Sequence, residues 1–248
     1  LSSLKELDLR ANQLTTIPES IGNLTSLKTL YLNGNLNEIP ESIGNLTSLK
    51  TLYLNGNLNE IPESIGNLTS LEILYLSNNR LRNISPQIIN LSSLRELKLG
   101  SNQLTSLPDV ITNLDSLRIL DLKHNNISIL PDTIGKFTQL WELDLWNNQL
   151  TTLPESIGNL TQLRKLRLWE NQLTTLPESI GNLTQLRELN LAENQLTTLP
   201  ESIGNLTQLK KLSLWENQLT SLPESIGNLI QLRELGLAKN QLTSLPES

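Results

Sequence analysis

The sequence contains no cysteine and no methionine, and it has one phenylalanine and one histidine among its 248 residues. The absence of cysteine excludes a disulfide framework, a thiolate metal site and a cysteine nucleophile. The single histidine, His124, has no second histidine or cysteine with which to bind a metal ion. Leucine and isoleucine must therefore fill almost all of the core, and so uniform a core indicates a repetitive structure.

The sequence also lacks long hydrophobic runs. No stretch approaches the ~18 consecutive apolar residues that a membrane span needs, so we predict no membrane insertion. Residues 1–10 lack the basic start and apolar run of a signal peptide. The nine N-x-S/T sequences are interpreted as turns without glycans, which favours a cytoplasmic protein, or a bacterial surface or secreted protein, over secretion through a glycosylating pathway.

What the sequence does contain is the pattern L-x-x-L-x-L-x-x-N, repeated eleven times at intervals of 22 or 23 residues. The x-L-x-L-x part predicts a short strand with inward leucines, and successive coils are expected to stack their strands in parallel. We expect each asparagine to bond buried backbone groups in its own coil and the neighbouring one. The predicted structural ladder consists of Asn12, Asn35, Asn57, Asn79, Asn102, Asn125, Asn148, Asn171, Asn194, Asn217 and Asn240.

Each repeat also carries a segment such as P-E-S-I-G-N-L at residues 154–160. Proline and the acidic residue that usually follows it suit the first turn of a helix, and glycine and asparagine end that turn. Because leucine or isoleucine precedes the proline and is a poor N-cap, we predict one short 3₁₀ or α turn per coil.

The two patterns together, L-x-x-L-x-L-x-x-N-x-L followed by L-P-E-S-I-G-N-L, resemble the leucine-rich repeats over the whole chain. The 23-residue length is similar to that of bacterial repeat proteins, of plant intracellular Ras-group-related repeat proteins and of the repeat domains of Roco-type GTPases. Extracellular animal members usually carry cysteine-rich caps, which this chain lacks.

The resemblance implies an α/β solenoid: a leucine-rich-repeat horseshoe with a parallel β-sheet on the concave face and short 3₁₀/α turns on the convex side. It implies a single domain over residues 1–248, with eleven repeats, the last of them truncated, and without caps. We expect further sequence on one or both sides, or end-to-end self-association through the uncapped ends. It also implies a binding protein rather than an enzyme, with its ligand on the concave face.

The residues between the strand leucines differ from repeat to repeat, and at these variable strand positions we expect information about the ligand. Every tyrosine and tryptophan occurs there, whereas Phe137 replaces a core leucine. Aromatic side chains kept on a surface are typical of interface centres. Duplication of neighbouring repeats offers another explanation, since residues 24–45 and 46–67 are identical. The candidate ligand-binding residues are Tyr31, Tyr53, Tyr75, Lys98, Asp121, His124, Trp141, Asp144, Trp146, Arg167, Trp169 and Trp215.

Two irregularities interrupt the pattern. The second and third repeats are one residue short after the ladder asparagine, and Pro86 comes one place late in the fourth repeat. Our hypothesis is that the second to fourth repeats form a distinct subsite around the tyrosines.

The distribution of charge bears on the kind of partner. The variable strand positions hold sixteen Lys or Arg against twelve Asp or Glu, although the chain as a whole has a net charge of −6. Nucleic acid would require a clustered basic footprint, so we predict no nucleic-acid binding. A groove of mixed charge suits a protein surface.

No arrangement of residues predicts catalysis or a cofactor. Asp121 and Asp144 occupy the same position in neighbouring repeats, and their carboxylates would have the spacing of a glycosidase pair. Lys98 and Arg167 occupy that position in the repeats on either side, which favours a ladder of ion pairs. A glycine-rich phosphate loop and a nucleophile elbow are absent. The predicted function is non-enzymatic recognition of a protein partner. The alternatives are carbohydrate binding through the tryptophans and a structural scaffold without a ligand.

Overall fold

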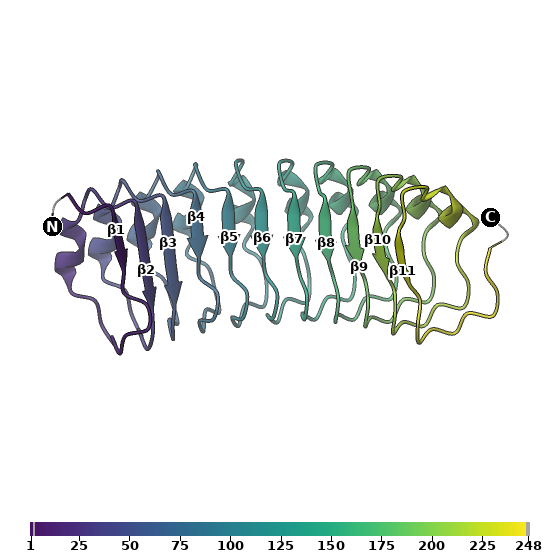
Figure 1. Ribbon diagram of the computed structural model, residues 1–248, viewed down its shortest axis with the longest axis horizontal. Helices are drawn as coiled ribbons and strands as arrows, with labels where there is room; N and C mark the ends of the chain where they lie inside the picture. The colour runs from purple at the N-terminus through teal and green to yellow at the C-terminus, as the bar shows by residue number, and fades with distance from the viewer. Residues whose placement is uncertain (2, 247–248) are drawn as a thin grey trace. The chain divides into compact units, whose positions relative to one another are not determined.

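The computed structural model describes residue 1 and residues 3–246, with only the backbone at Val110. The chain packs as two compact units, Leu1–Asp121 (unit 1) and Leu122–Ser248 (unit 2). In both units a coil consists of one strand, a loop and one five-residue 3₁₀ turn, except that no turn follows the last strand within the described residues (Figure 1). This is the solenoid predicted from the repeat, and all of its turns in the described residues are 3₁₀ turns rather than α turns. The single domain over residues 1–248 stays a prediction.

In unit 1 the strands follow one another in chain order and pair in parallel. They are β1 (Glu6–Asp8), β2 (Thr29–Asn33), β3 (Thr51–Asn55), β4 (Ile73–Tyr75), β5 (Glu96–Lys98) and β6 (Ile119–Asp121). The turns are η1 (Glu19–Asn23), η2 (Glu41–Asn45), η3 (Glu63–Asn67), η4 (Pro86–Asn90) and η5 (Asp109–Asn113).

Unit 2 is built in the same way, with parallel strands in chain order. Its strands are β7 (Glu142–Asp144), β8 (Lys165–Arg167), β9 (Glu188–Asn190), β10 (Lys211–Ser213) and β11 (Glu234–Gly236). Its turns are η6 (Asp132–Lys136), η7 (Glu155–Asn159), η8 (Glu178–Asn182), η9 (Glu201–Asn205) and η10 (Glu224–Asn228). Figure 1 shows the turns of each unit behind its layer of strands.

Leucine and isoleucine fill the space between strands and turns, as the composition predicts. Leu189 and Leu212, which face each other on β9 and β10, are 0 % and 1 % exposed. Phe137 takes the place of a core leucine and is buried. In the last coil this packing is incomplete, and Leu235 and Leu245 are exposed. Self-association through these side chains stays a prediction. Within the described residues, no helix has the length and apolar character needed to cross a membrane.

The proline lies one residue earlier than its predicted place in nine repeats. It is the N-cap of nine turns, in an extended conformation such as φ −71°, ψ 152° at Pro154. Only Pro86 occupies the first turn, where Ser85 caps η4 and accepts a hydrogen bond from the Gln87 amide. In several repeats the acidic residue bonds to the next coil instead of capping its own turn, as when Glu155 accepts from the Ser179 amide.

The asparagine ladder satisfies backbone groups at the turn that follows each strand. The Asn194 amide donates to Leu191 O in its own coil and to Leu168 O in the preceding coil, at 3.1 and 2.9 Å. Its oxygen accepts from the Leu173 amide at 3.0 Å. The same three bonds are made by Asn79, Asn102, Asn148, Asn171, Asn217 and Asn240. Asn12 and Asn125 bond carbonyl groups of their own coils.

Asn35 and Asn57 depart from the predicted ladder. In the part of the chain that the structure describes, neither side chain makes a hydrogen bond. Their repeats are the two that are one residue short. The Asn57 amide donates to Leu36 O at 3.0 Å, whereas in a regular coil the residue after the asparagine makes this bond, as Gln103 does to Leu81 O. Asn57 thus lies one place out of register with the regular ladder asparagines.

Removing a ladder amide is expected to destabilise the solenoid. Asn194→Ala leaves the Leu173 amide and two carbonyl groups without their buried partner, which should cost about 2 kcal/mol. Asn35→Ala is the matched control and should leave stability nearly unchanged. Urea unfolding followed by circular dichroism measures both, and equal midpoints for the two variants would contradict the ladder.

The glycine found in most of the 3₁₀ turns permits close packing of neighbouring coils. A Cβ on Gly181 would lie 2.5 Å from the Ser202 carbonyl oxygen. Backbone cannot move away cheaply from such a contact, so only glycine fits there. In η4 and η5 the equivalent residues are Ile89 and Thr112, so these turns accept a side chain at this place.

Gly181→Ala should therefore lower stability by about 2 kcal/mol, because the added methyl group forces two coils apart. Gly236→Ala serves as the control, since its Cβ would meet no atom closer than 3.6 Å. Thermal unfolding of both variants tests this. A Gly181→Ala protein that melts with the control would show that the coils can separate without cost.

Candidate functional site

The residues between the strand leucines form one partly exposed surface in each unit, which we call the strand face. Along β2, Leu30 and Leu32 are fully buried, whereas Thr29, Tyr31 and Asn33 between them are partly exposed. This alternation follows from the period of two in a strand. The candidate residues on the strands belong to this face.

Tyr31, Tyr53 and Tyr75 form a tyrosine stack on the strand face of unit 1. They pair in register on β2, β3 and β4. Their ring centroids are 4.6 and 4.1 Å apart, and the planes differ by 27° and 16°. Neighbouring rungs of a parallel sheet bring equivalent side chains to about 4.8 Å, which is stacking distance. The three identical residues therefore cover one another's ring faces.

Cations cover the two ends of the tyrosine stack. The Arg10 guanidinium lies 4.3 Å from the Tyr31 ring centroid, and the Lys98 ammonium lies 5.6 Å from that of Tyr75. Glu96 holds the second end in place, since it accepts from the Tyr75 hydroxyl at 2.9 Å and pairs with Lys98 at 3.2 Å. Burial and the hydrogen bond to Glu96 raise the pKa of the Tyr75 hydroxyl above its usual value. The stack thus offers ring edges to a partner, because its faces are occupied.

Trp146, Trp169 and Trp215 form a tryptophan row on unit 2. The Trp146 and Trp169 rings are stacked with centroids 4.8 Å apart and planes within 4°. His124 lies against the other side of Trp146 at 4.2 Å. The ring centroids of Trp169 and Trp215 are 6.0 Å apart, and the rings are tilted toward each other. Ala192, the equivalent residue of the repeat between them, is fully buried. The row is continuous, and its members shield one another from water.

Glutamates of the following coils hold the indole rings. The Trp146 Nε1–H donates to Glu170 at 3.1 Å, and the Trp169 Nε1–H donates to Glu193 at 2.9 Å. Glu170 and Glu193 have φ values of 57° and 49°, in the left-handed region that glycine and asparagine adopt more easily. Long acidic side chains in that conformation are not required by the fold. Their bonds to the indoles give them a role in fixing the tryptophan row.

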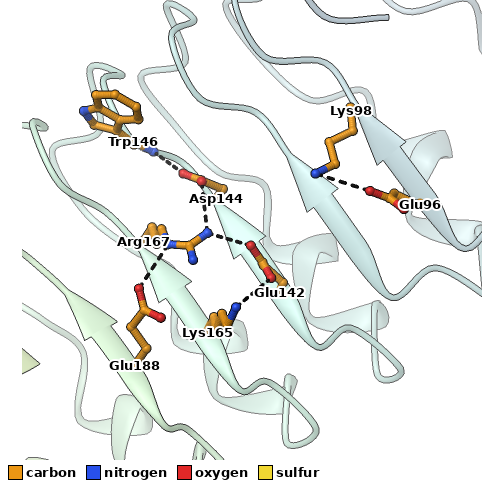
Figure 2. A network of polar contacts seen from close by, with 8 residues as sticks. All are labelled: Glu96, Lys98, Glu142, Asp144, Trp146, Lys165, Arg167 and Glu188. Carbon is orange, nitrogen blue, oxygen red and sulfur yellow. Dashed lines mark hydrogen bonds and ion pairs between the residues drawn. The ribbon is translucent and has the colours of Figure 1, made fainter. Parts of the chain in front are cut away.

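Arg167 is the centre of a charged network on β7, β8 and β9 (Figure 2). Its guanidinium lies 2.6 Å from Glu142, 3.4 Å from Asp144 and 3.1 Å from Glu188. Lys165 also approaches Glu142, at 3.6 Å. Burial disfavours the charged form of Arg167, but the hydrogen bond to Glu142 and the neighbouring carboxylates outweigh it and raise the pKa of Arg167 above its usual value.

The network and the tryptophan row enclose a hollow of about 300 Å³ on the strand face of unit 2. Asp144 is buried there, and it also accepts from the Trp146 backbone amide at 3.1 Å. Lys98, which was expected to belong to a ladder of ion pairs with Asp121, pairs with Glu96 instead. The lining residues of the hollow are Lys123, Asp144, Trp146, Arg167, Trp169 and Asn190.

The structure brings the predicted residues together in two groups, one in each unit. Trp141 lies at the margin of its group, where Arg164 stacks over its ring at 4.8 Å. The first group is Tyr31, Tyr53, Tyr75, Lys98 and Asp121, and the second is His124, Trp141, Asp144, Trp146, Arg167, Trp169 and Trp215.

Sequence reasoning overlooked the acidic residues that position these groups, namely Glu96, Glu142, Glu170, Glu188 and Glu193. Positions in a repeat are counted here from the first leucine of L-x-x-L. The third position alternates between Glu and Lys in repeats seven to eleven, and this alternation was the available signal for part of the network. Among the described residues, no three His, Cys, Asp or Glu side chains are placed to hold a metal ion.

Comparison with protein families gives one result for the whole chain. The family model described as a leucine-rich repeat region matches residues 1–99, 81–176 and 171–248. No curated protein sequence matches the chain.

Solved structures with the same fold include a leucine-rich-repeat protein of Leptospira interrogans, which is 37% identical with a TM-score of 0.89. The match covers 99% of this chain and 69% of that one. A TDR receptor is 31% identical with a TM-score of 0.84, over 97% of this chain and 44% of the receptor chain. A chain of the Toll–Spatzle complex of Drosophila is 28% identical with a TM-score of 0.86, over 97% and 34%. This chain therefore spans less than half of the latter two.

Removing Arg167 is expected to destabilise unit 2 by about 1–2 kcal/mol, between the values for exposed and for buried ion pairs. Arg167→Ala leaves three carboxylates close together without their shared cation. Lys136→Ala is the control, because Lys136 is exposed and makes no ion pair within the described residues. The measurement is chemical unfolding at low and high salt. Added salt should reduce the difference in unfolding free energy between the Arg167→Ala variant and the unaltered chain. Equal stability of the two variants would contradict a structural role for the network.

Proposed function

The chain belongs to the leucine-rich-repeat family, and from that premise we propose that it is a non-enzymatic module that binds a protein partner on its strand face. The observation that carries the proposal is the placement of the aromatic residues. The sequence has seven tyrosines and tryptophans, and six of them form the tyrosine stack and the tryptophan row. The core uses leucine and isoleucine, so the scaffold does not need these rings.

The chemistry of both groups supports a protein partner. Tyrosine, tryptophan and arginine are the residue types that contribute most at protein interfaces. The rings are held by stacking and by hydrogen bonds before any partner arrives, so little side-chain freedom is lost on binding. Among the similar structures, one is a complex of two proteins, Toll and Spatzle.

Carbohydrate binding is the alternative function, and the geometry gives it less support. An indole binds a sugar ring through its flat face, but Trp146 lies between His124 and Trp169 and has both faces covered. The tyrosine stack is likewise covered at its ends by Arg10 and Lys98. A partner meets ring edges, charged groups and amides at this surface, which a protein complements more readily than a sugar.

The proposal predicts that capture of a partner depends on the strand face. We expect Tyr53→Ala combined with Trp169→Ala to lower the amount of bound partner at least about tenfold, as the loss of two interface anchors would. The measurement is quantitative mass spectrometry of proteins retained from extracts of the source organism. Thr151→Ala combined with Thr174→Ala, on exposed loop residues, is the control.

A partner retained equally by all three proteins would overturn the proposal, provided that circular dichroism shows each of them folded. Tryptophan emission offers a second readout, since all four tryptophans lie in unit 2. A change of emission on titration with oligosaccharides, but not with the captured protein, would favour the carbohydrate alternative.

A further inference from the structure

A row of four adjacent cations runs along the start of the strands in unit 2. Each of these residues immediately precedes its strand, and backbone hydrogen bonds of 2.9 Å join each one to the next. We call Arg164, Arg187, Lys210 and Arg233 the cation row. The corresponding row of unit 1 is interrupted by Glu72, which pairs with Lys50 at 2.8 Å.

The cation row is not neutralised by the protein itself. Arg164 stacks on Trp141, while Arg187, Lys210 and Arg233 make no ion pair with any described residue. Like charges on neighbouring strands repel one another and lower stability. An alternating arrangement, such as the one at the next position, would avoid this cost, since Lys211 pairs there with Glu234 at 2.8 Å. An anionic partner would relieve the repulsion.

A trough lies directly beside this row. Its volume is about 510 Å³, and it covers β9, β10 and β11. Small residues at the fifth position of each repeat, Asn190, Ser213 and Gly236, provide its floor, where Tyr or Arg stands in other repeats. Each of the last three cations is followed in the chain by a residue that lines the trough, namely Glu188, Lys211 or Glu234. Together these six charged residues have a net charge of +2, on a chain of net charge −6.

We propose that this trough binds an α-helix of a protein partner that carries an acidic stripe along the cation row. The spacing favours a helix. Neighbouring rungs are about 4.8 Å apart, so four cations span about 14 Å. Helical residues at i, i+3, i+7 and i+10 span about 15 Å on one face, whereas four side chains on one face of an extended chain span about 20 Å. Only the helix keeps one acid opposite each cation.

The charges beyond the row argue against nucleic acid as the occupant. Glu170, Glu193 and Glu216 follow the strands at their opposite ends, in the eighth position of each repeat. A polyanion that covers the width of the strand face meets these carboxylates and is repelled. A helix with acids on one side only does not present charge to them.

This inference rests on the proposed function, because it names the kind of protein segment that the strand face accepts. The probe is a fluorescent, alanine-rich helical peptide with glutamates along one face. A peptide of the same composition with the glutamates distributed around the helix is the control. We expect the striped peptide to bind the whole chain at low salt about fivefold or more tightly than the control peptide, by fluorescence anisotropy.

The variants that test the site are Arg187→Glu combined with Lys210→Glu, and Gly236→Leu, which fills the trough. We expect each to weaken binding of the striped peptide about tenfold, to the level of the control peptide. Arg80→Glu combined with Lys136→Glu, on two exposed residues outside the trough, is the matched change of charge and should alter binding less than about twofold.

Three results would overturn the inference: no binding of the striped peptide, equal binding of both peptides, or tighter binding of oligodeoxythymidylate than of the striped peptide. These results are distinct from failure of the proposed function. The proposed function fails if the combined Tyr53→Ala and Trp169→Ala variant captures as much partner as the unaltered chain, whereas the peptide experiment measures the trough alone.

Discussion

Every other feature of this protein depends on one constraint, which is that a single coil cannot bury its own leucines. Each coil is covered only by its neighbours, so strands, loops and turns must all stack at the spacing of a parallel sheet. The ladder asparagines satisfy the backbone where the chain leaves the sheet, and turn glycines such as Gly181 let the outer sides of the coils approach equally closely. The scaffold thus determines the leucine, asparagine, glycine and proline positions and leaves the strand face free to vary.

The fold could be predicted from the sequence because its determinants lie within one period of the chain. Leucine spacing predicts the strands, and the buried Phe137 follows from its place in the pattern. The departures at Asn35 and Asn57 could not be predicted, since they depend on how a loop shortened by one residue changes the register of the backbone hydrogen bonds. Proline as an N-cap was missed for a similar reason, because proline suits both that place and the first turn.

The candidate site was predictable in position but not in geometry. The repeat pattern placed Tyr53 and Trp169 on the strand face. The stacking of Tyr53 on Tyr75, and of Trp169 on Trp146, depends on rotamers that neighbouring coils select together. The hydrogen bond from Trp169 to Glu193 joins residues that are 24 positions apart in the sequence, and no short sequence pattern predicts it. Such bonds between neighbouring coils hold surface side chains in one conformation. A rigid surface selects partners by shape as well as by charge.

The contact between turn glycine and the following serine is the same from coil to coil in the regular repeats. A coil of this kind has two matching sides, and a copy placed beside it meets contacts that already exist. The identical residues 24–45 and 46–67 show such a copy. The gene can therefore lengthen by whole repeats without requiring a new kind of contact between neighbouring coils. The strand-face residues of a duplicate can then change while the original coil stays as it was.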